Sequence, residues 1–320
     1  MKIHNTKISV LAPARLHMGF IDLSGSLGRD FGSIGVALNE INTRLSVIEG
    51  KHLTATGLYA ERAKTYAAKL CKELAVPDNL NLIIESAIPE HVGLGSGTQM
   101  SLAVGSAINA FYNLGLSIRE IARLTDRGLR SGVGIGIFEH GGLIVDGGRG
   151  ENTITPPVLA RNPVPDDWRF ILVFDHRGQG LHGKQEINAF KTLPPFPAQT
   201  AAQLCYLLLM QGLPALVEED LKRFGEVITF LQKTVGGYFA PVQGGIFTSA
   251  EVAEAMAWLE QQGAVALGQT SWGPTGFCLV EDVDKADTLC EKAKTRFAHH
   301  EHLIFITASA RNTGGEIYTQ

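Results

Sequence analysis

The chain has 320 residues, of which 45% are hydrophobic and 19% are charged, which is enough for a large core and favours two domains. A formal net charge of −4 excludes a general basic field for nucleic acid, and we expect neither a signal peptide nor an apolar run as long as a membrane span. The four cysteines stand far apart, which predicts reduced thiols in a cytoplasmic protein rather than disulfides or a metal site.

A short apolar strand is predicted over residues 7–12, and polar side chains follow it at spaced positions. Arg15, His17 and Asp22 stand there among apolar residues. Because successive side chains of a strand point to opposite faces, Arg15 and His17 share one face and can meet an anionic ligand together. A half-exposed edge strand with a solvated arginine is the alternative.

Residues 24–35 form a glycine-rich loop with Arg29 near its centre, where the side chain faces either a site or solvent. Hydrophobic periodicity then predicts a strand over 36–49, a helix over 59–74 and a buried strand over 80–88. The last of these strands leads directly into the most informative stretch of the chain.

That stretch is a loop that reads Gly93-Leu94-Gly95-Ser96-Gly97-Thr98-Gln99 and precedes a helix predicted over 100–111. Its glycines let the backbone turn tightly and approach a ligand closely. Its hydroxyls lie near the unpaired N–H groups of a helix N-terminus, which readily bind anions. The loop therefore predicts a cradle for phosphate or diphosphate, with an ordinary capped glycine turn as the alternative. It is not a Walker A loop, because no lysine follows the last glycine, and its spacing differs from the dinucleotide fingerprint.

A capping box formed by Ser117 and Glu120 predicts a helix that runs to about residue 130. The next segment, over 130–148, predicts a glycine-rich turn followed by a hairpin. Glu139 lies where that hairpin could reach a ligand, and a structural role for it is as well supported as a chemical one. Asp146 precedes two glycines and is interpreted as a turn residue.

The proline-rich stretch over 152–168 marks the predicted domain boundary. A strand over 169–174 leads into a loop with histidines and basic residues among glycines, in which Lys184 either helps to clamp a diphosphate or is solvated. Further helices are predicted over 199–210, 218–231, 250–261 and 285–297, and further strands over 277–280 and 303–308.

A third glycine-containing loop carries Thr270, Ser271 and Gly273, whose hydroxyls and N–H groups can close over a ligand. Trp272 in the same loop can stack on an aromatic ring, although a packing role is favoured. The run His299-His300-Glu301-His302 offers metal-binding side chains, but nothing in the sequence fixes their geometry, so a solvated helix end is favoured there.

Three of these motifs, in this order, resemble the GHMP kinase superfamily (galactokinase, homoserine kinase, mevalonate kinase and relatives). Pro-x-x-x-Gly-Leu-Gly-Ser over residues 89–96 looks like its central motif. Ala-Arg-Leu-His over 14–17, Gly-Leu-Gly-Ser-Gly-Thr-Gln over 93–99 and Gly-x-Thr-Ser-x-Gly-Pro-Thr over 268–275 look like one branch, the beta-ribofuranosylaminobenzene 5'-phosphate synthases. In the kinases a Ser-Gly-x-Asp segment carries the catalytic acid/base. Here the matching position holds Gly134, so the kinase base is missing.

The resemblance implies an α+β, GHMP-type fold of two domains. These are a ribosomal-S5-like N-terminal domain over 1–160, with the glycine-rich phosphate loop, and a ferredoxin-like C-terminal domain over 161–320. It implies a synthase of tetrahydromethanopterin biosynthesis that condenses phosphoribosyl pyrophosphate with 4-aminobenzoate or 4-hydroxybenzoate and releases CO2 and pyrophosphate. Mg²⁺ and a homodimer are expected with it, and no nucleic-acid or membrane partner. The alternatives are a GHMP-type ATP-dependent small-molecule kinase and an inactive ligand-binding relative.

The pattern and the resemblance together give a candidate site. The catalytic candidates are Glu139 and Asp22. The substrate-binding candidates are Arg15, His17, Arg29, Gly93, Leu94, Gly95, Ser96, Gly97, Thr98, Gln99, Lys184, Thr270, Ser271 and Gly273. No metal ligand is assigned, and the sequence does not choose between an amino and a hydroxyl group on the benzoate acceptor.

Overall fold

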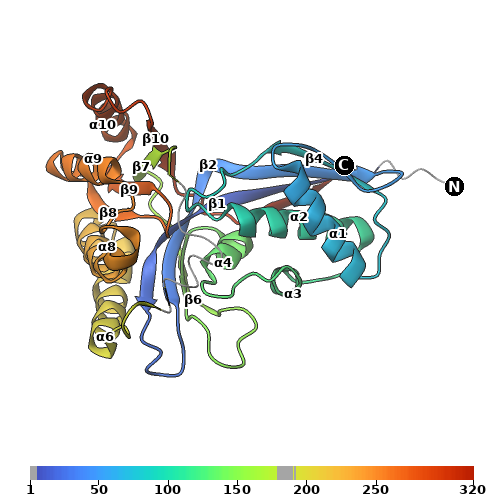
Figure 1. Cartoon of the computed structure of the whole chain (residues 1–320), viewed down its shortest axis with the longest axis horizontal. Coiled ribbons are helices and arrows are strands. Elements are labelled where there is room, and N and C mark those ends of the chain that lie inside the picture. The colour runs from blue at the N-terminus through green and yellow to red at the C-terminus, as the bar shows by residue number, and fades with distance from the viewer. Residues whose placement is uncertain (1–5, 179–189, 191) are drawn as a thin grey trace.

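The structure is a computed structural model that describes residues 6–178, 190 and 192–320. Two sheets stand side by side, and helices pack against each of them (Figure 1). Lys184, a predicted substrate-binding residue, lies outside the described residues together with the rest of the segment over 179–189.

The first sheet has seven strands, with the order β11-β1-β2-β4-β3 along its main path and with β5 and β6 added beside β2. The strands are β1 (Ile8–Asp22), β2 (Gly32–Glu49), β3 (Thr54–Gly57), β4 (Leu80–Ser86), β5 (Leu143–Asp146), β6 (Val158–Asn162) and β11 (Glu316–Thr319). The helices that accompany it are α1 (Ala60–Glu73), α2 (Ser96–Tyr112), α3 (Ile118–Leu124) and α4 (Val133–His140). β11 pairs antiparallel with β1, so the end of the chain returns to the first sheet.

The second sheet has four strands in the order β10-β7-β9-β8, and all of its pairs are antiparallel. The strands are β7 (Arg169–Asp175), β8 (Val265–Gln269), β9 (Thr275–Val280) and β10 (Leu303–Ser309). Its helices are α6 (Ala198–Leu207), α7 (Leu213–Val217), α8 (Leu221–Gln243), α9 (Ala250–Gln261) and α10 (Val283–Arg296), and a π-helical turn, η1 (Leu208–Gly212), joins α6 to α7.

One hydrophobic core joins the two sheets and explains why the site can draw residues from both halves of the chain. Phe170 and Leu172 of β7 belong to the same buried cluster as Leu16 of β1. Ile171 and Val173, on the opposite face of β7, belong to a separate cluster with α9 and α10. Because strand side chains alternate between faces, β7 is buried on both sides and fixes the second sheet against β1.

The segment after residue 130 differs from its prediction. Val133–His140 form helix α4 where a glycine-rich turn and hairpin were expected, and only Leu143–Asp146 form a strand. The glycines here serve close packing, because a Cβ on Gly136 would lie 2.9 Å from both Ile144 and Val158. A glycine-rich run can therefore form a buried helix when neighbouring strands approach its backbone more closely than a side chain would allow.

The predicted capping box is confirmed. The Ser117 side chain accepts a hydrogen bond from the backbone N–H of Glu120, and the Glu120 carboxylate accepts one from the backbone N–H of Ser117. The helix that it starts, α3, ends at Leu124, earlier than the predicted end near residue 130.

The expectation that no apolar run is as long as a membrane span is wrong for one segment. α6, η1 and α7 form a continuous helix over Ala198–Val217 that is long and apolar enough to cross a membrane by length and composition alone. The core helix of a protein that never enters a membrane passes the same test, so this single helix is weak evidence for a span.

Candidate active site

The glycine loop between β4 and α2 has the geometry of an anion cradle. Gly93 and Gly95 have φ angles of 84° and 77°, a left-handed conformation that favours glycine. Gly95 is the N-cap of α2, and Gln99 N donates to Gly95 O at 3.0 Å to begin the helix. The N–H groups of residues 96–98 come before this first helical hydrogen bond and have no partner within the helix, and no acidic residue lies in the first turn. The loop therefore presents N–H donors at the positive end of the helix dipole.

The structure brings the first and third motifs onto this loop. The backbone N–H of Arg15 donates to Leu94 O at 3.0 Å, and its guanidinium donates to Gly93 O at 3.3 Å. The hydroxyl of Thr270 accepts from the backbone N–H of His17 and donates to Gly93 O, both at 2.9 Å. One threonine thus connects β1, the glycine loop and the loop after β8, and the three motifs meet in space.

Glycine is required where these loops touch. A Cβ on Gly93 would overlap the carbonyl oxygen of Thr270, and a Cβ on Gly273 would overlap the carbonyl group of Val92. Ser271, which follows Thr270 in the third loop, has a φ of 57° and lines a neighbouring pocket. The loops are consequently packed backbone against backbone, which fixes the position of the cradle relative to both sheets.

His17 does not carry the positive charge that its predicted role as an anion-binding residue suggests. Its side chain is buried, and burial together with the nearby Arg15 lowers the pKa of His17 well below its ordinary value of 6.5. The imidazole is therefore neutral at neutral pH. It packs edge-on against Phe20, with a distance of 4.9 Å between ring centroids.

A pocket lies beside His17, between β1 and α8. Among the side chains that line it are Phe20, Phe239, Ser271 and Trp272. Trp272 is 4% exposed, and its ring centroid lies 4.3 Å from that of Phe239, which supports the packing role favoured from the sequence. The pocket therefore combines aromatic walls with a few polar groups, as small-molecule sites commonly do.

Two arginines that sequence reasoning missed lie at the first turn of α2. A Cβ on Gly97 would lie 2.5 Å from Nη2 of Arg62 and 3.5 Å from Nη1 of Arg127. Arg62 comes from α1 and pairs with Glu90, and both arginines donate to the hydroxyl of Tyr66. The spacing of Arg62 and Tyr66 places them on one helix face, but only the tertiary fold brings Arg127 and the cradle to the same place.

Arg127 is held in an unfavourable position for a cation. Burial, and also the like charge of Arg62, lower the pKa of Arg127, although the neighbouring Tyr66 acts in the opposite direction. Its Nε is buried and has no hydrogen-bond partner among the described residues. Glu90 compensates the charge of Arg62, but among the described residues no carboxylate forms an ion pair with Arg127, so a further anion beside the two guanidinium groups would relieve their repulsion. The arrangement is therefore suited to a ligand with concentrated negative charge, such as a diphosphate.

The position of the missing kinase base faces the cradle. A Cβ on Gly134 would lie 3.1 Å from the methyl group of Thr98, so a side chain there would point toward the first turn of α2. Gln99 donates from Nε2 to Gly134 O at 2.8 Å, and its Oε1 is buried without a partner in the described part of the chain. Asp146 accepts from the backbone N–H of Gly132 at 3.0 Å and so fixes the start of α4.

Three predicted site residues make their contacts elsewhere. Asp22 accepts two hydrogen bonds from Ser24 at 2.7 Å, and Arg29 donates to the carbonyl oxygens of residues 147 and 148. Glu139 lies at the other end of α4 from Gly134 and pairs with Arg119 at 3.1 Å. Asp22 is seven residues from Arg15 along β1, about 20 Å at the usual rise per residue. These contacts support structural roles, and the catalytic roles of Asp22 and Glu139 stay predictions.

The fold and the glycine loop define a class of protein. The family models for the GHMP kinases N terminal domain and for the GHMP kinases C terminal domain match residues 59–142 and 213–299. Mevalonate diphosphate decarboxylase from Staphylococcus aureus has a TM-score of 0.68 at 18% identity, with 98% of each chain covered. Homoserine kinase from Cytophaga hutchinsonii has a TM-score of 0.64 at 14% identity, with 99% of each chain covered. The chain therefore has the two-domain GHMP fold, as expected.

Sequence relatives place the chain within that class. The beta-ribofuranosylphenol 5'-phosphate synthase of Archaeoglobus fulgidus is 34% identical, with 95% of this chain and 97% of the relative covered. The protein of the same name from Methanocaldococcus jannaschii is also 34% identical, with 97% of this chain and 99% of the relative covered. This chain belongs to the beta-ribofuranosylphenol 5'-phosphate synthase family, a branch of the GHMP kinase superfamily.

Proposed function

We propose that this protein is a decarboxylating phosphoribosyltransferase that joins phosphoribosyl pyrophosphate to a para-substituted benzoate. The names of its relatives specify a ribofuranosylphenol, which supports 4-hydroxybenzoate as the acceptor, with 4-aminobenzoate as the alternative. The observation that carries the proposal is the cradle at the start of α2, which has two arginines beside Gly97 and a glycine, Gly134, at the kinase-base position.

The chemistry suits this set of residues. The bond between C1 of the ribose and the diphosphate breaks, which leaves an oxocarbenium-like centre, and the ring carbon that bears the carboxylate attacks that centre. The bond to the carboxylate then breaks, CO2 leaves, and the electron pair restores the aromatic ring. Negative charge accumulates on the leaving diphosphate, where the N–H groups of residues 96–98, Arg62 and Arg127 would stabilise it. No hydroxyl group has to lose a proton for bond formation, so the absence of a carboxylate at residue 134 is no obstacle.

The acceptor needs a place next to the ribose. The pocket lined by Phe20 and Phe239 lies beside the junction made by Thr270, and its aromatic walls suit a benzoate ring. Its free space is only about 30 Å³, so these walls would have to move apart to admit the ring. We propose that the ring enters from this side while the diphosphate lies on the cradle. His17 borders the pocket as a neutral imidazole, which avoids burying a second cation beside Arg15.

Mg²⁺, a homodimer and a cytoplasmic location are proposed on the resemblance alone. Mg²⁺ is usually held by one or two carboxylates together with substrate phosphates. At the cradle the first turn of α2 has no acidic residue, and Glu90 is paired with Arg62. Among the described residues, Asp22 and Asp30 are neighbouring carboxylates: burial raises the pKa of Asp30, and the negative charge of Asp22 adds to that effect. This pair lies at the far end of β1 from the cradle. The described residues alone do not form a Mg²⁺ site at the cradle, so the diphosphate would supply most of the ligands.

The reaction itself is the direct test. We expect carboxyl-labelled 4-hydroxybenzoate and phosphoribosyl pyrophosphate to give labelled CO2 and pyrophosphate in equal amounts, and EDTA to stop the release. ATP with homoserine, mevalonate or a sugar should give no ADP above the background of enzyme-free mixtures. Production of ADP from one of these acceptors without release of label would contradict the synthase and favour the kinase. Running 4-aminobenzoate in parallel decides the acceptor.

Gly134 offers a second test of the same proposal. We expect Gly134→Asp to create no kinase activity, because a carboxylate alone does not supply a nucleotide site. We also expect it to reduce release of CO2 by at least about tenfold, because the new side chain would press on Thr98, 3.1 Å from the added Cβ, and place a negative charge near the diphosphate. Gly134→Ala is the matched control, since it adds the Cβ without the charge. Appearance of ADP with Gly134→Asp would contradict the proposal.

A further inference from the structure

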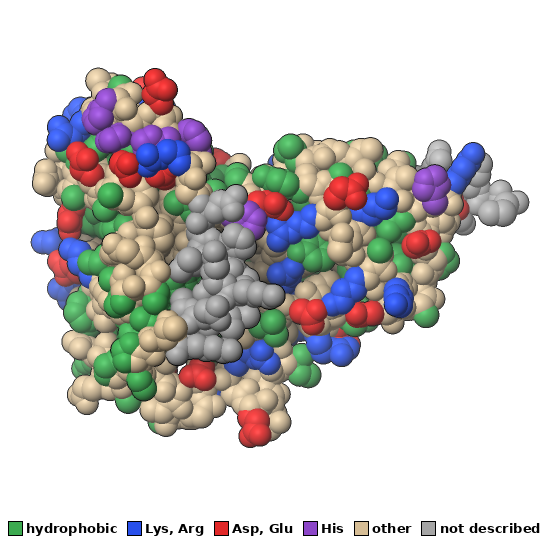
Figure 2. Space-filling view, in the orientation of Figure 1, with side chains coloured by type: hydrophobic (Ala, Val, Ile, Leu, Met, Phe, Trp, Pro, Cys, Tyr) green, Lys and Arg blue, Asp and Glu red, His purple; other side chains and the backbone are tan. Residues whose placement is uncertain are grey.

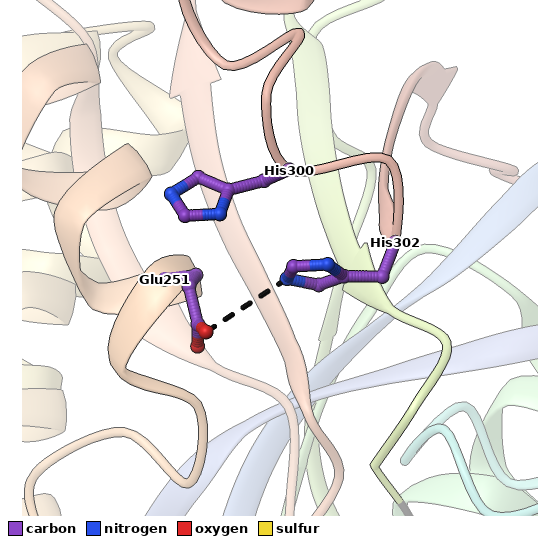
Figure 3. A group of neighbouring side chains, drawn as sticks. All are labelled: Glu251, His300 and His302. Carbon is purple, nitrogen blue, oxygen red and sulfur yellow. Dashed lines mark ion pairs between the residues drawn. The ribbon is translucent and has the colours of Figure 1, made fainter.

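Histidines gather on the second sheet's side of the molecule, away from the glycine loop (Figure 2). Two of them, His300 and His302, lie on the turn between α10 and β10. Figure 3 shows the His302 ring pointing toward the carboxylate of Glu251, which lies in the first turn of α9, and the His300 ring beside the same side chain. The sequence placed the histidines next to one another but gave no indication of Glu251, which is 49 residues before His300 in the chain.

The three side chains meet as metal ligands do. One ligand atom from each of Glu251, His300 and His302 lies within 4.8 Å of the other two. Nε2 of His302 is 3.9 Å from Oε1 of Glu251. That same Nε2 is buried and has no hydrogen-bond partner among the described residues. A buried imidazole nitrogen without a partner is uncommon and needs a missing donor, acceptor or metal ion to satisfy it.

Rigid neighbours hold two of the ligands in place. The backbone N–H of His176 donates to His302 O at 3.1 Å, and β10 begins its pairing with β7 at the next residue, Leu303. Ser249 caps α9 by accepting from Val252 N at 3.2 Å. Its hydroxyl also donates to Asp175 at 2.8 Å, which ties the start of α9 to the end of β7. Such contacts fix the orientation of the side chains that bind a metal ion, and so less conformational entropy is lost when the ion binds.

Arg177 already occupies one side of this cluster. Its Nη2 lies 2.8 Å from Oε1 of Glu251 and 2.8 Å from Oδ2 of Asp175. The Arg177 side chain is 50% exposed, so it can leave Glu251 for solvent and keep its contact with Asp175. A metal ion would therefore compete with Arg177 for one oxygen atom.

We propose that Glu251, His300 and His302 bind one divalent transition metal ion of the Zn²⁺ type. Two imidazoles and a carboxylate favour Zn²⁺ over Mg²⁺, which prefers oxygen ligands. Tetrahedral Zn²⁺ with ligands at about 2.0–2.1 Å needs ligand atoms about 3.4 Å apart, so a small closure of the half-buried His300 ring completes the site with water as the fourth ligand. The ion joins α9 to the turn before β10 and stabilises the second sheet.

Titration of tag-free, metal-stripped protein with ZnCl2 tests the site by calorimetry and by thermal unfolding. We expect one Zn²⁺ per chain with a micromolar or lower Kd, a rise in unfolding temperature that follows mass action, and no such rise with MgCl2. His300→Ala and Glu251→Gln should each weaken Zn²⁺ binding at least tenfold. His52→Ala is the matched control, because this exposed histidine lies between β2 and β3, is not part of the group and should leave the Kd unchanged.

Two outcomes would overturn the site. One is the absence of saturable binding at 100-fold excess of ZnCl2 over protein. The other is equal affinity in wild type, His300→Ala and Glu251→Gln, which would mean loose binding to surface histidines. If His300→Ala lowers the unfolding temperature of the metal-free protein, the Zn²⁺ affinity of Glu251→Gln, which keeps the side-chain shape, decides whether the site exists.

Arg177→Gln provides an opposite test, because removing the cation that competes for Glu251 should tighten Zn²⁺ binding severalfold. Weaker binding would contradict coordination by Glu251.

Discussion

Gly95→Val is expected to abolish binding of phosphoribosyl pyrophosphate and turnover while the protein stays folded. The backbone at Gly95 has a φ of 77°, where a β-branched residue is strained by about 1–2 kcal/mol or more. Its Cβ would lie 3.3 Å from Cβ and 3.4 Å from Nε of Arg15, so the added methyl groups would displace the arginine or occupy the space of the ligand. A domain with a typical stability of 5–15 kcal/mol survives the strain, but the cradle does not keep its shape.

The measurement is the Kd for phosphoribosyl pyrophosphate and the rate of CO2 release, with circular dichroism to confirm folding. We expect both binding and rate to fall at least about 100-fold. Gly115→Val is the matched control, since Gly115 has a φ of 70° and nothing within 4 Å of its added Cβ. That variant carries the same backbone strain in an exposed loop and should keep normal binding. A folded Gly95→Val protein with normal affinity would mean that the diphosphate does not lie on this loop.

Arg127→Met is expected to weaken binding of phosphoribosyl pyrophosphate by about tenfold to 100-fold, which corresponds to the loss of a charge-assisted hydrogen bond of about 1.5–3 kcal/mol. Adding Arg62→Met should weaken it further. The unfolding temperature of the ligand-free protein should change little, because loss of the hydrogen bond to Tyr66 is offset by removal of a cation that burial and Arg62 disfavour. Loss of affinity without loss of stability distinguishes a ligand-binding arginine from one that holds the fold together.

Arg123→Met is the matched control, because Arg123 is an exposed arginine in the last turn of α3, near Arg127 in the chain. It should change neither the Kd nor the rate by more than about twofold. Isothermal titration at two salt concentrations adds a second readout, since removal of one phosphate-binding cation reduces the salt dependence of binding. An Arg127→Met protein that binds normally, or that loses affinity only because it unfolds, would return Arg127 to a structural role.

The local pattern of the sequence was sufficient for the glycine loop and for most of the secondary structure. A buried strand, a glycine run and a small-residue helix follow one another, and strand and helix periodicities are local properties that need no partner. The capping box at Ser117 is confirmed for the same reason, because its two hydrogen bonds join residues only three positions apart. The resemblance through three motifs was sufficient for the two-domain fold, which the family models and the solved structures confirm.

The tertiary structure decided what those patterns could not. Helix α4 was missed because glycine in a sequence usually indicates a turn. The use of glycine for close packing depends on which strands lie against the helix, and that is known only from the fold. His17 is neutral because of burial, and burial is a property of the assembled core rather than of one strand. Arg62 and Arg127 lie 65 positions apart in the chain, and no sequence pattern connects them. The sequence by itself was sufficient to predict the glycine loop as a candidate phosphate cradle. The packing of α1, α2 and α3 decided which cations stand beside that loop, because residues far apart in the chain become neighbours only in the folded protein.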